Sequence, residues 1–199
     1  EDFVHIELRS GTVLHASAEV VLGTGYPQAA ATKKQTITGE YPFKNKEYYT
    51  NGHLFHGPAL QCIDSIAACS DEGITGDTIS APSPSEWMTL PMRSSWLSDP
   101  MILDASFQMM ILWSFQQAGM ASLPTRITRY RQFQRRMPKD GARLHIHIDN
   151  AAKHSAIANI DILDKNNILV ARIEGYECVI DASLNEAFTR NTLVQSAKA

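Results

Sequence analysis

The feature that most constrains the fold is one long segment, residues 98–119, which is apolar on nearly every face of a helix. Asp99 suits the N-cap, Pro100 suits the first helical position, and Gly119 suits the carboxyl end. A helix that is apolar all round is expected to be buried. The segment therefore predicts a central helix around which the rest of the chain is wrapped.

One carboxyl in the middle of this helix has no capping role. Asp104 lies beyond the first turn, and Gln108 follows four residues later on the same face. Burial disfavours the charged form of a carboxyl, and a carboxyl that keeps its proton can donate it in a reaction. Asp104 and Gln108 are therefore the candidate catalytic residues. The alternative interpretation is a structural carboxyl that bonds to backbone groups.

Composition narrows the class of protein. The chain has 199 residues, 44% of them hydrophobic and 20% charged, which suits one globular domain or one and a half. A net charge of −3 does not favour nucleic acid or a membrane as the main partner. Three cysteines without CxxC spacing indicate neither a disulfide framework nor a zinc site, and they fit a reducing cytoplasm. No apolar run reaches the ~18 residues of a membrane span, and no signal peptide is evident.

Strands are expected on both sides of the helix. Before it we expect a hairpin at 4–8 and 12–22, an aperiodic linker at 23–40, a strand pair at 66–80, and an irregular loop around Pro82, Pro84 and Pro91. After it we expect strands only, at 125–133, 143–149, 155–163 and 168–180, and then a frayed tail. The predicted class is α+β: a curved antiparallel sheet around a long buried helix, which is a hotdog fold.

Two further groups of residues carry charge or metal-binding potential. His145 and His147 share one face of a strand, but no third ligand is evident, so no metal site is expected. Five arginines lie close together in the sequence: Arg126, Arg129, Arg131, Arg135 and Arg136. They could dock an acidic carrier protein or a phosphate, or they could be ordinary solubility charges. We favour the second interpretation.

Two stretches of the chain resemble a known family. They read Leu54-Phe55-His56-Gly57-Pro58-Ala59-Leu60-Gln61 and, some forty residues later, Asp99-Pro100-Met101-Ile102-Leu103-Asp104-Ala105-Ser106-Phe107-Gln108. Together they resemble the C-terminal half of the dehydratase domains of polyketide synthases and polyunsaturated fatty acid synthases, which are double hotdogs. The resemblance covers roughly residues 41–180.

This resemblance also implies a division of the chain. Its parts would be the closing strands of a truncated first hotdog at 1–22, a linker at 23–40, the second hotdog at 41–185, and a flexible tail at 186–199.

The resemblance implies a hydro-lyase of the 3-hydroxyacyl-[acyl-carrier-protein] dehydratase type. Such an enzyme removes water from a β-hydroxyacyl thioester on the phosphopantetheine arm of an acyl carrier protein, without a metal or other cofactor. By this resemblance Asp104 protonates the leaving hydroxyl, and Gln108 orients Asp104 or bonds that hydroxyl. His56, Gly57 and Pro58 would line the substrate site, with Gly57 allowing close approach or a positive φ. A purely structural role for His56 stays open.

The family's catalytic base is not found in this sequence. That base is a histidine in an H-x-x-x-G-x-x-x-x-P motif of the first hotdog; here His53 and Gly57 have the right spacing, but Cys62 stands where proline should be. We therefore expect the base to lie outside this chain, which would be incomplete or inactive alone. The expected partners are acyl carrier protein, adjacent synthase domains or the missing hotdog, and a second copy of the chain.

Two alternatives belong to other functional classes. One is a non-catalytic hotdog that binds an acyl chain or acts as a scaffold, and the absent histidine motif favours it. The other is a hotdog thioesterase, which would use the helix carboxylate to cleave an acyl thioester and would release a free thiol.

Overall fold

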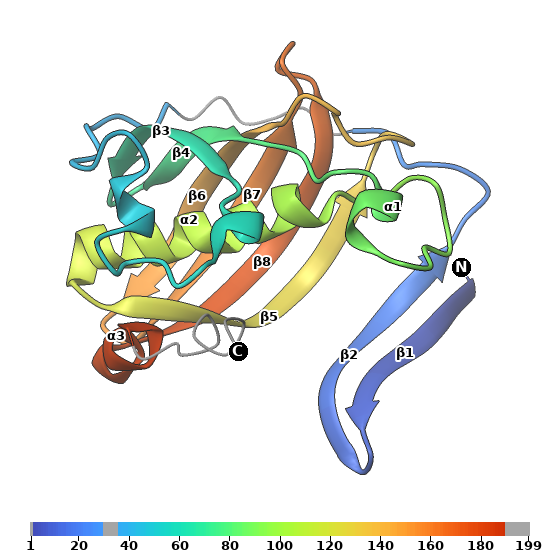
Figure 1. Ribbon diagram of the computed structural model, residues 1–199, viewed down its shortest axis with the longest axis horizontal. Helices are drawn as coiled ribbons and strands as arrows, with labels where there is room; N and C mark the ends of the chain where they lie inside the picture. The colour runs from blue at the N-terminus through green and yellow to red at the C-terminus, as the bar shows by residue number, and fades with distance from the viewer. Residues whose placement is uncertain (1, 30–35, 190–199) are drawn as a thin grey trace.

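A single long helix lies across one face of a curved antiparallel sheet (Figure 1). The computed structural model describes residues 2–29 and 36–189. In chain order the elements are β1 (Asp2–Ser10), β2 (Val13–Leu22), η1 (Glu47–Tyr49), η2 (Pro58–Leu60), β3 (Ile63–Ser70), β4 (Gly73–Thr78), α1 (Pro84–Trp87), α2 (Pro100–Ala118), β5 (Ala121–Gln132), β6 (Arg143–Ala152), β7 (Ser155–Leu163), β8 (Leu169–Asp181) and α3 (Ala182–Thr189).

The ends of α2 are fixed by the residues that the sequence predicted. Asp99 caps the helix, because its carboxylate accepts hydrogen bonds from the backbone N–H groups of Met101 and Ile102 at 2.9 and 3.0 Å. Pro100 occupies the first turn, and Gly119 ends the helix in the left-handed conformation with φ of 67°. Burial raises the pKa of Asp99, although these backbone hydrogen bonds oppose that shift.

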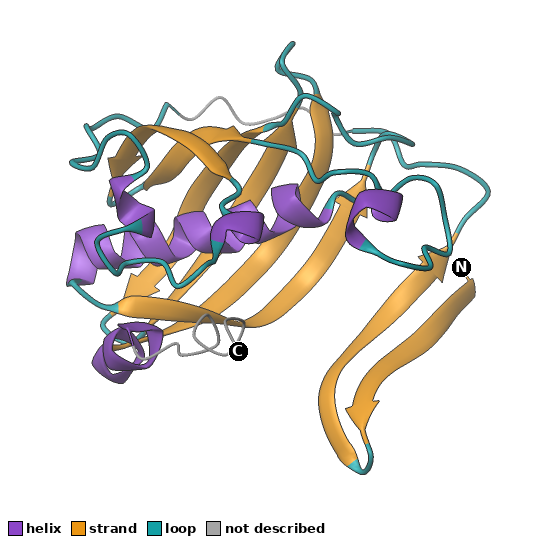
Figure 2. Cartoon of the chain, viewed as in Figure 1, coloured by secondary structure: helices purple, strands orange, loops and turns teal. Residues whose placement is uncertain are grey.

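The sheet wraps around α2 in the strand order β3-β4-β6-β7-β8-β5, and every neighbouring pair is antiparallel. Apolar side chains of α2 and of the inner sheet face form one core, which includes Met109, Leu112, Leu144, Ile146 and Ile160. Figure 2 shows the helix and the six strands as two layers. The α+β hotdog fold predicted from the sequence is confirmed.

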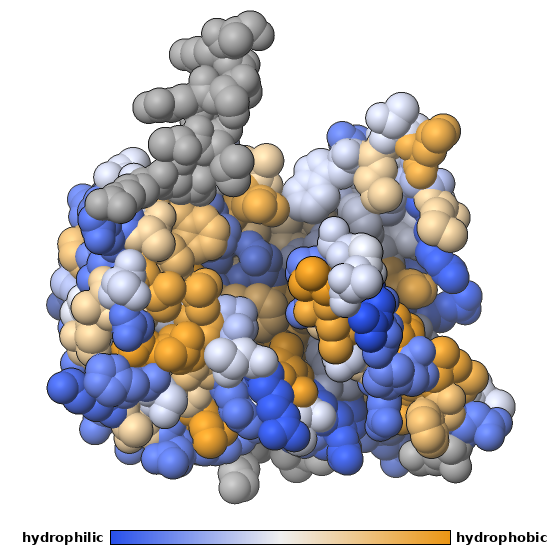
Figure 3. Space-filling model, turned by 90° about the horizontal axis from the view of Figure 1, so that it is seen from below, coloured by the Kyte–Doolittle hydropathy of each residue, from blue (hydrophilic) through white to orange (hydrophobic). Residues whose placement is uncertain are grey.

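The first two strands form a separate sheet. β1 and β2 pair antiparallel from Asp2 opposite Leu22 to Ser10 opposite Val13, and every residue in both strands is exposed. This hairpin stands away from the six-stranded sheet (Figures 1 and 2). The surface seen from below mixes hydrophobic with hydrophilic residues (Figure 3). The hairpin therefore forms by local pairing without a layer to cover it.

Two helices depart from the sequence prediction. We expected strands only after the central helix, but α3 follows β8 directly. Asn185 holds it in place by accepting from the backbone N–H of Ala121 at 2.7 Å and donating to the carbonyl of Gly119 at 3.0 Å. The proline-rich loop likewise contains the short helix α1, which a capping box between Ser83 and Glu86 stabilises. Local capping and tertiary hydrogen bonds, rather than periodicity, determine both helices.

Several boundaries are also refined. The predicted strand pair at 66–80 is present as β3 and β4, and it begins at Ile63. Within the segment read as a linker, Ile37 is buried and the carbonyl of Gly39 accepts from Cys69 N–H at 3.1 Å. Of the segment expected as a flexible tail, residues 186–189 belong to α3, and 190–199 lie outside the described residues. In the described part of the chain, every helix is too short or too polar to cross a membrane.

Candidate active site

The structure brings the two candidate catalytic side chains into direct contact. Gln108 donates from Nε2 to Oδ2 of Asp104 at 2.7 Å and to the carbonyl of Leu60 at 2.7 Å. Gln108 is fully buried, whereas one third (33%) of the Asp104 side chain is exposed. The sequence predicted a buried carboxyl, and Asp104 is instead only partly buried. Asp104 lies on the side of α2 that faces the loop before β3, where a part of it reaches solvent.

A tyrosine that the sequence did not single out completes this arrangement. Tyr49, at the end of η1, donates from its hydroxyl to Oε1 of Gln108 at 2.6 Å and accepts from the backbone N–H of Ile63 at 2.9 Å. Burial raises the pKa of Tyr49 far above its ordinary value, so its hydroxyl keeps its proton. Tyr49 lies in a segment without periodicity, and its partner is 59 residues away in the sequence. No local signal points to it.

Cys62 packs beside the same pair. Its Sγ lies 3.5 Å from Nε2 of Gln108 and 3.8 Å from Oδ2 of Asp104. Burial, assisted by the nearby charge of Asp104, raises the pKa of the Cys62 thiol to about 12. A thiol that stays protonated is a poor nucleophile, so Cys62 is a wall of the site. Cys62 is itself fully buried.

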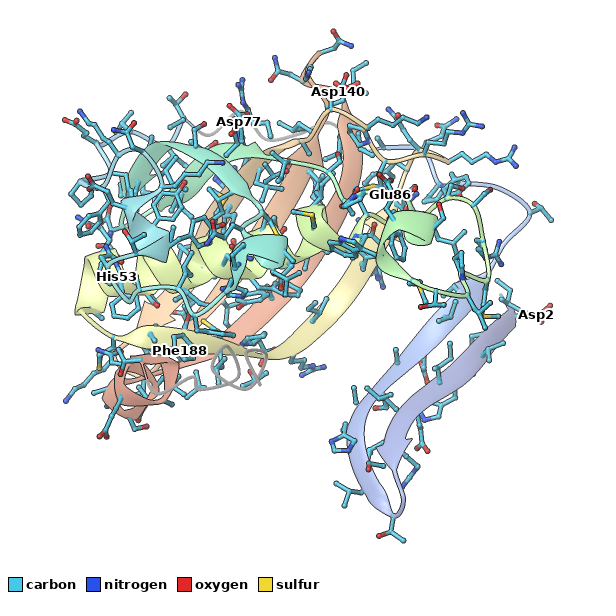
Figure 4. The ribbon with its side chains drawn as sticks, viewed as in Figure 1. Asp2, His53, Asp77, Glu86, Asp140 and Phe188 are labelled. Carbon is cyan, nitrogen blue, oxygen red and sulfur yellow. The ribbon has the colours of Figure 1, made fainter. Side chains whose placement is uncertain are left out.

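His56 lies next to Asp104, with its Nε2 3.7 Å from Oδ2. Burial lowers the pKa of His56, and the neighbouring Asp104 partly offsets this shift. Its Nδ1 is buried without a hydrogen-bond partner among the described residues. Its ring stacks on Phe55, which in turn contacts Phe188 of α3 with ring centres 4.4 Å apart. Figure 4 labels Phe188 on α3 and His53 beside the carboxyl end of α2.

Gly57 and Pro58 act through the backbone, but not in the way that the sequence suggested. Gly57 has φ of −67° and ψ of 170°, and open space surrounds the position of a Cβ. Neither a positive φ nor a close approach requires glycine here within the described residues, so that expectation is wrong. Pro58 opens η2, and this turn directs the carbonyl of Leu60 at Gln108.

The other candidate groups lie outside this site. Arg126 and Arg131 pair across the sheet with Glu177 and Glu174 of β8. His145 and His147 lie half-buried side by side, with ring centres 6.3 Å apart. Over residues 2–29 and 36–189, no three His, Cys, Asp or Glu side chains gather as a metal site would need.

Comparison with known proteins places this arrangement in a family. The fold and the site define a hotdog domain with a carboxyl–amide pair on its central helix. The family described as "Polyketide synthase dehydratase N-terminal domain" matches residues 28–180, so the chain belongs to the polyketide synthase dehydratase family. That description names the N-terminal domain, whereas the two motifs of this chain resemble the C-terminal half.

A curated relative supports the same family. The chain is 30% identical over 133 residues to a polyunsaturated fatty acid synthase of Thraustochytrium sp., an alignment that covers 66% of this chain and 5% of that protein. The chain therefore corresponds to a small part of that synthase.

Solved dehydratase domains share the fold. A trans-AT polyketide synthase dehydratase domain from Brevibacillus brevis is 14% identical with a TM-score of 0.62, covering 90% of this chain and 64% of that one. The dehydratase domain of a mycocerosic acid synthase-like polyketide synthase is 17% identical with a TM-score of 0.61, covering 88% and 62%. The dehydratase domain from the CurJ module of curacin polyketide synthase is 16% identical with a TM-score of 0.60, covering 88% and 59%. The chain thus spans about three fifths of each solved domain.

Proposed function

We propose that this chain is the C-terminal hotdog of a dehydratase that acts on a β-hydroxyacyl thioester carried by the phosphopantetheine arm of an acyl carrier protein. The product is the α,β-enoyl thioester. Membership of the dehydratase family and the Asp104–Gln108 contact on the central helix support this proposal. The reaction needs an acid and a base, and no metal or redox cofactor.

The observation that carries the proposal is a difference between the two oxygens of Asp104. Oδ2 accepts from Gln108 at 2.7 Å, and both Cys62 and His56 lie close to that same oxygen. In the described part of the chain, Oδ1 accepts no hydrogen bond, and the side chain is one third (33%) exposed. Oδ1 is therefore the oxygen that can hold a proton and present it to a bound substrate.

The elimination then follows with balanced protons. A base removes the proton from the α-carbon, and that electron pair forms the double bond to the β-carbon. The bond from the β-carbon to its hydroxyl oxygen breaks, and the oxygen takes the proton from Oδ1 of Asp104 and leaves as water. General acid catalysis by a positioned carboxyl typically contributes about 10²–10⁴-fold to the rate.

We assign the base to a first hotdog rather than to His56. His56 is directed at Oδ2, the oxygen already held by Gln108, and only 8% of its side chain is exposed. In this proposal His56, Gly57 and Pro58 line the substrate site beside Asp104. The chain covers only 59–64% of the solved dehydratase domains, which leaves a substantial part of such a domain to supply the base.

A dehydration assay tests this function. The substrate is a β-hydroxyacyl-pantetheine thioester, and the enoyl product is followed by mass. The chain alone and the chain joined to the hotdog that precedes it in the synthase are compared. Activity in the joined form only is expected. Activity in neither form would favour a binding or scaffolding hotdog, and release of free thiol would identify a thioesterase.

A further inference from the structure

We propose that Tyr49 is the positioning residue of this site: it fixes the orientation of the Gln108 amide and thereby selects which oxygen of Asp104 carries the proton. This inference rests on the proposed function, because it assigns Tyr49 a role in the same proton transfer. Tyr49 is a positioning residue and not a catalytic one, because it contacts Gln108 and not the reacting atoms.

The direction of the hydrogen bond between Tyr49 and Gln108 follows from the third partner. The backbone N–H of Ile63 donates to the Tyr49 hydroxyl at 2.9 Å, and a backbone N–H can only donate. The Tyr49 hydroxyl proton is then available for the amide, which lies 2.6 Å away. A glutamine side chain accepts only through its oxygen, so Oε1 must face Tyr49.

The other half of the amide is determined by the same contact. With Oε1 facing Tyr49, the NH2 group of Gln108 is directed to the opposite side. Its two protons meet the carbonyl of Leu60 and Oδ2 of Asp104, each at 2.7 Å. A flipped amide would place Oε1 against two acceptors and NH2 against a hydroxyl that already receives one donor. Tyr49 and Leu60 therefore favour one orientation from both ends.

This orientation has a consequence for Asp104. Because Gln108 can only donate toward Asp104, Oδ2 is the accepting oxygen, and this hydrogen bond favours a proton of Asp104 on Oδ1. Without the Tyr49 hydroxyl, Oε1 would lose its donor, and the carbonyl of Leu60 would be left to oppose a turned amide that accepts a proton from Oδ2. The acid would then hold its proton on Oδ2, the oxygen that faces Gln108 and Cys62, rather than on Oδ1.

The chain offers a matched control in the preceding residue. Tyr48 is buried, with 2% of its surface exposed, but its hydroxyl has no hydrogen-bond partner among the described residues. Tyr48→Phe and Tyr49→Phe therefore remove the same hydroxyl oxygen from neighbouring rings, of which Tyr48 is buried and Tyr49 is partly buried. Only the second removes a hydrogen bond to Gln108.

The kinetic test uses the intact synthase domain. Tyr49→Phe is expected to lower kcat about 10-fold with little change in KM, and Tyr48→Phe to stay within about 2-fold of wild type. In a Gln108→Ala background, Tyr49→Phe should add less than about 2-fold, because the two residues act as one unit. Equal activities of the two phenylalanine variants, or an undiminished Tyr49→Phe effect in the Gln108→Ala background, would overturn the inference.

A second readout does not depend on turnover. In this chain, the Gln108 side-chain NH2 should give nitrogen-15 NMR signals with slow hydrogen exchange, since both protons are bonded. Tyr49→Phe should accelerate that exchange and Tyr48→Phe should not; no acceleration would contradict the positioning role. Full activity of Asp104→Asn in the synthase would instead refute the proposed function, whatever the NMR result, so the two failures are distinguishable.

Discussion

The hairpin β1–β2 and the wrapped sheet around α2 contain similar apolar residues in opposite circumstances. Leu8 of the hairpin is 64% exposed, whereas Leu112 of α2 is fully buried. Both regions are antiparallel sheets whose strands pair with each other through the backbone. The difference is a covering layer: α2 covers the six-stranded sheet, while none of the described residues covers either face of the hairpin.

This comparison indicates that the hairpin, unlike the six-stranded sheet, needs a further layer to cover its apolar residues. A two-stranded hairpin alone is marginally stable in water, and exposed apolar surface usually marks an interaction site. The candidate site, by contrast, lies between the buried helix α2 and the segment before β3, where hydrogen bonds hold Gln108 and Tyr49 in place. The proposed first hotdog would give the hairpin the layer that it lacks here.

The largest expected effect comes from one matched substitution in the two regions. Leu112→Ala should reduce the free energy of unfolding by about 2–5 kcal/mol, because it leaves a cavity in the core. Leu8→Ala should stay within about 0.5 kcal/mol in this chain. Urea unfolding measures both. Similar losses would mean that the hairpin is packed, and a larger Leu8→Ala loss in the joined double hotdog would support the missing layer.

Ion pairs give a second comparison of the same regions. Arg172 binds Asp161 through two hydrogen bonds on β7 and β8, and the two side chains are only 15% and 9% exposed. Arg172→Ala should reduce the free energy of unfolding by about 2 kcal/mol, because Asp161 keeps its charge without a partner. This loss is somewhat smaller than for a fully buried pair, because solvent reaches part of both side chains. Arg9→Ala removes the exposed pair with Glu7 and should leave the unfolding midpoint unchanged. Equal effects in urea unfolding would contradict this contrast.

The cap of α2 predicts a smaller loss. Asp99→Ala removes the acceptor for Met101 and Ile102 and the contact with the backbone N–H of Ala81. The expected cost is about 1–2 kcal/mol, which corresponds to a decrease in Tm of roughly 2–8 °C. Asp71→Ala, in the exposed turn between β3 and β4, is the control and should leave Tm unchanged. A Tm for Asp99→Ala equal to that of the control would show that the cap is dispensable.

The smallest effect is a pH dependence from His56. Burial lowers its pKa in the folded protein, so below the ordinary value near 6.5 the unfolded chain binds more protons than the folded one. Stability should therefore fall as the pH drops below about 6.5, and this loss should level off once the folded pKa is passed. His56→Gln should flatten part of this slope between about pH 7 and pH 5 in thermal unfolding. If His56→Gln left the slope of stability against pH unchanged, this result would contradict a lowered pKa of His56 in the folded protein.

How far the sequence predicted the molecule depends on the range of the interactions. The helix caps at Asp99 and Gly119 and the hairpin turns depend on neighbouring residues, which the sequence shows directly. The alternation of apolar residues at Leu144 and Ile146 likewise predicts strand β6. Asp104 and Gln108 lie one helical turn apart, so the sequence also predicted that their side chains share a face. Tyr49 and α3 were missed because their hydrogen bonds join residues more than 50 positions apart. Such contacts exist only in the folded chain.

The most direct test of the central claim is the activity of Asp104→Asn in the intact synthase domain. The amide matches the carboxyl in shape but cannot supply the proton to the leaving hydroxyl. The account predicts a loss of kcat of about 10²–10⁴-fold for formation of the enoyl thioester, with the fold unchanged by circular dichroism. Wild-type turnover by Asp104→Asn would show that this carboxyl is not the acid and would contradict the account.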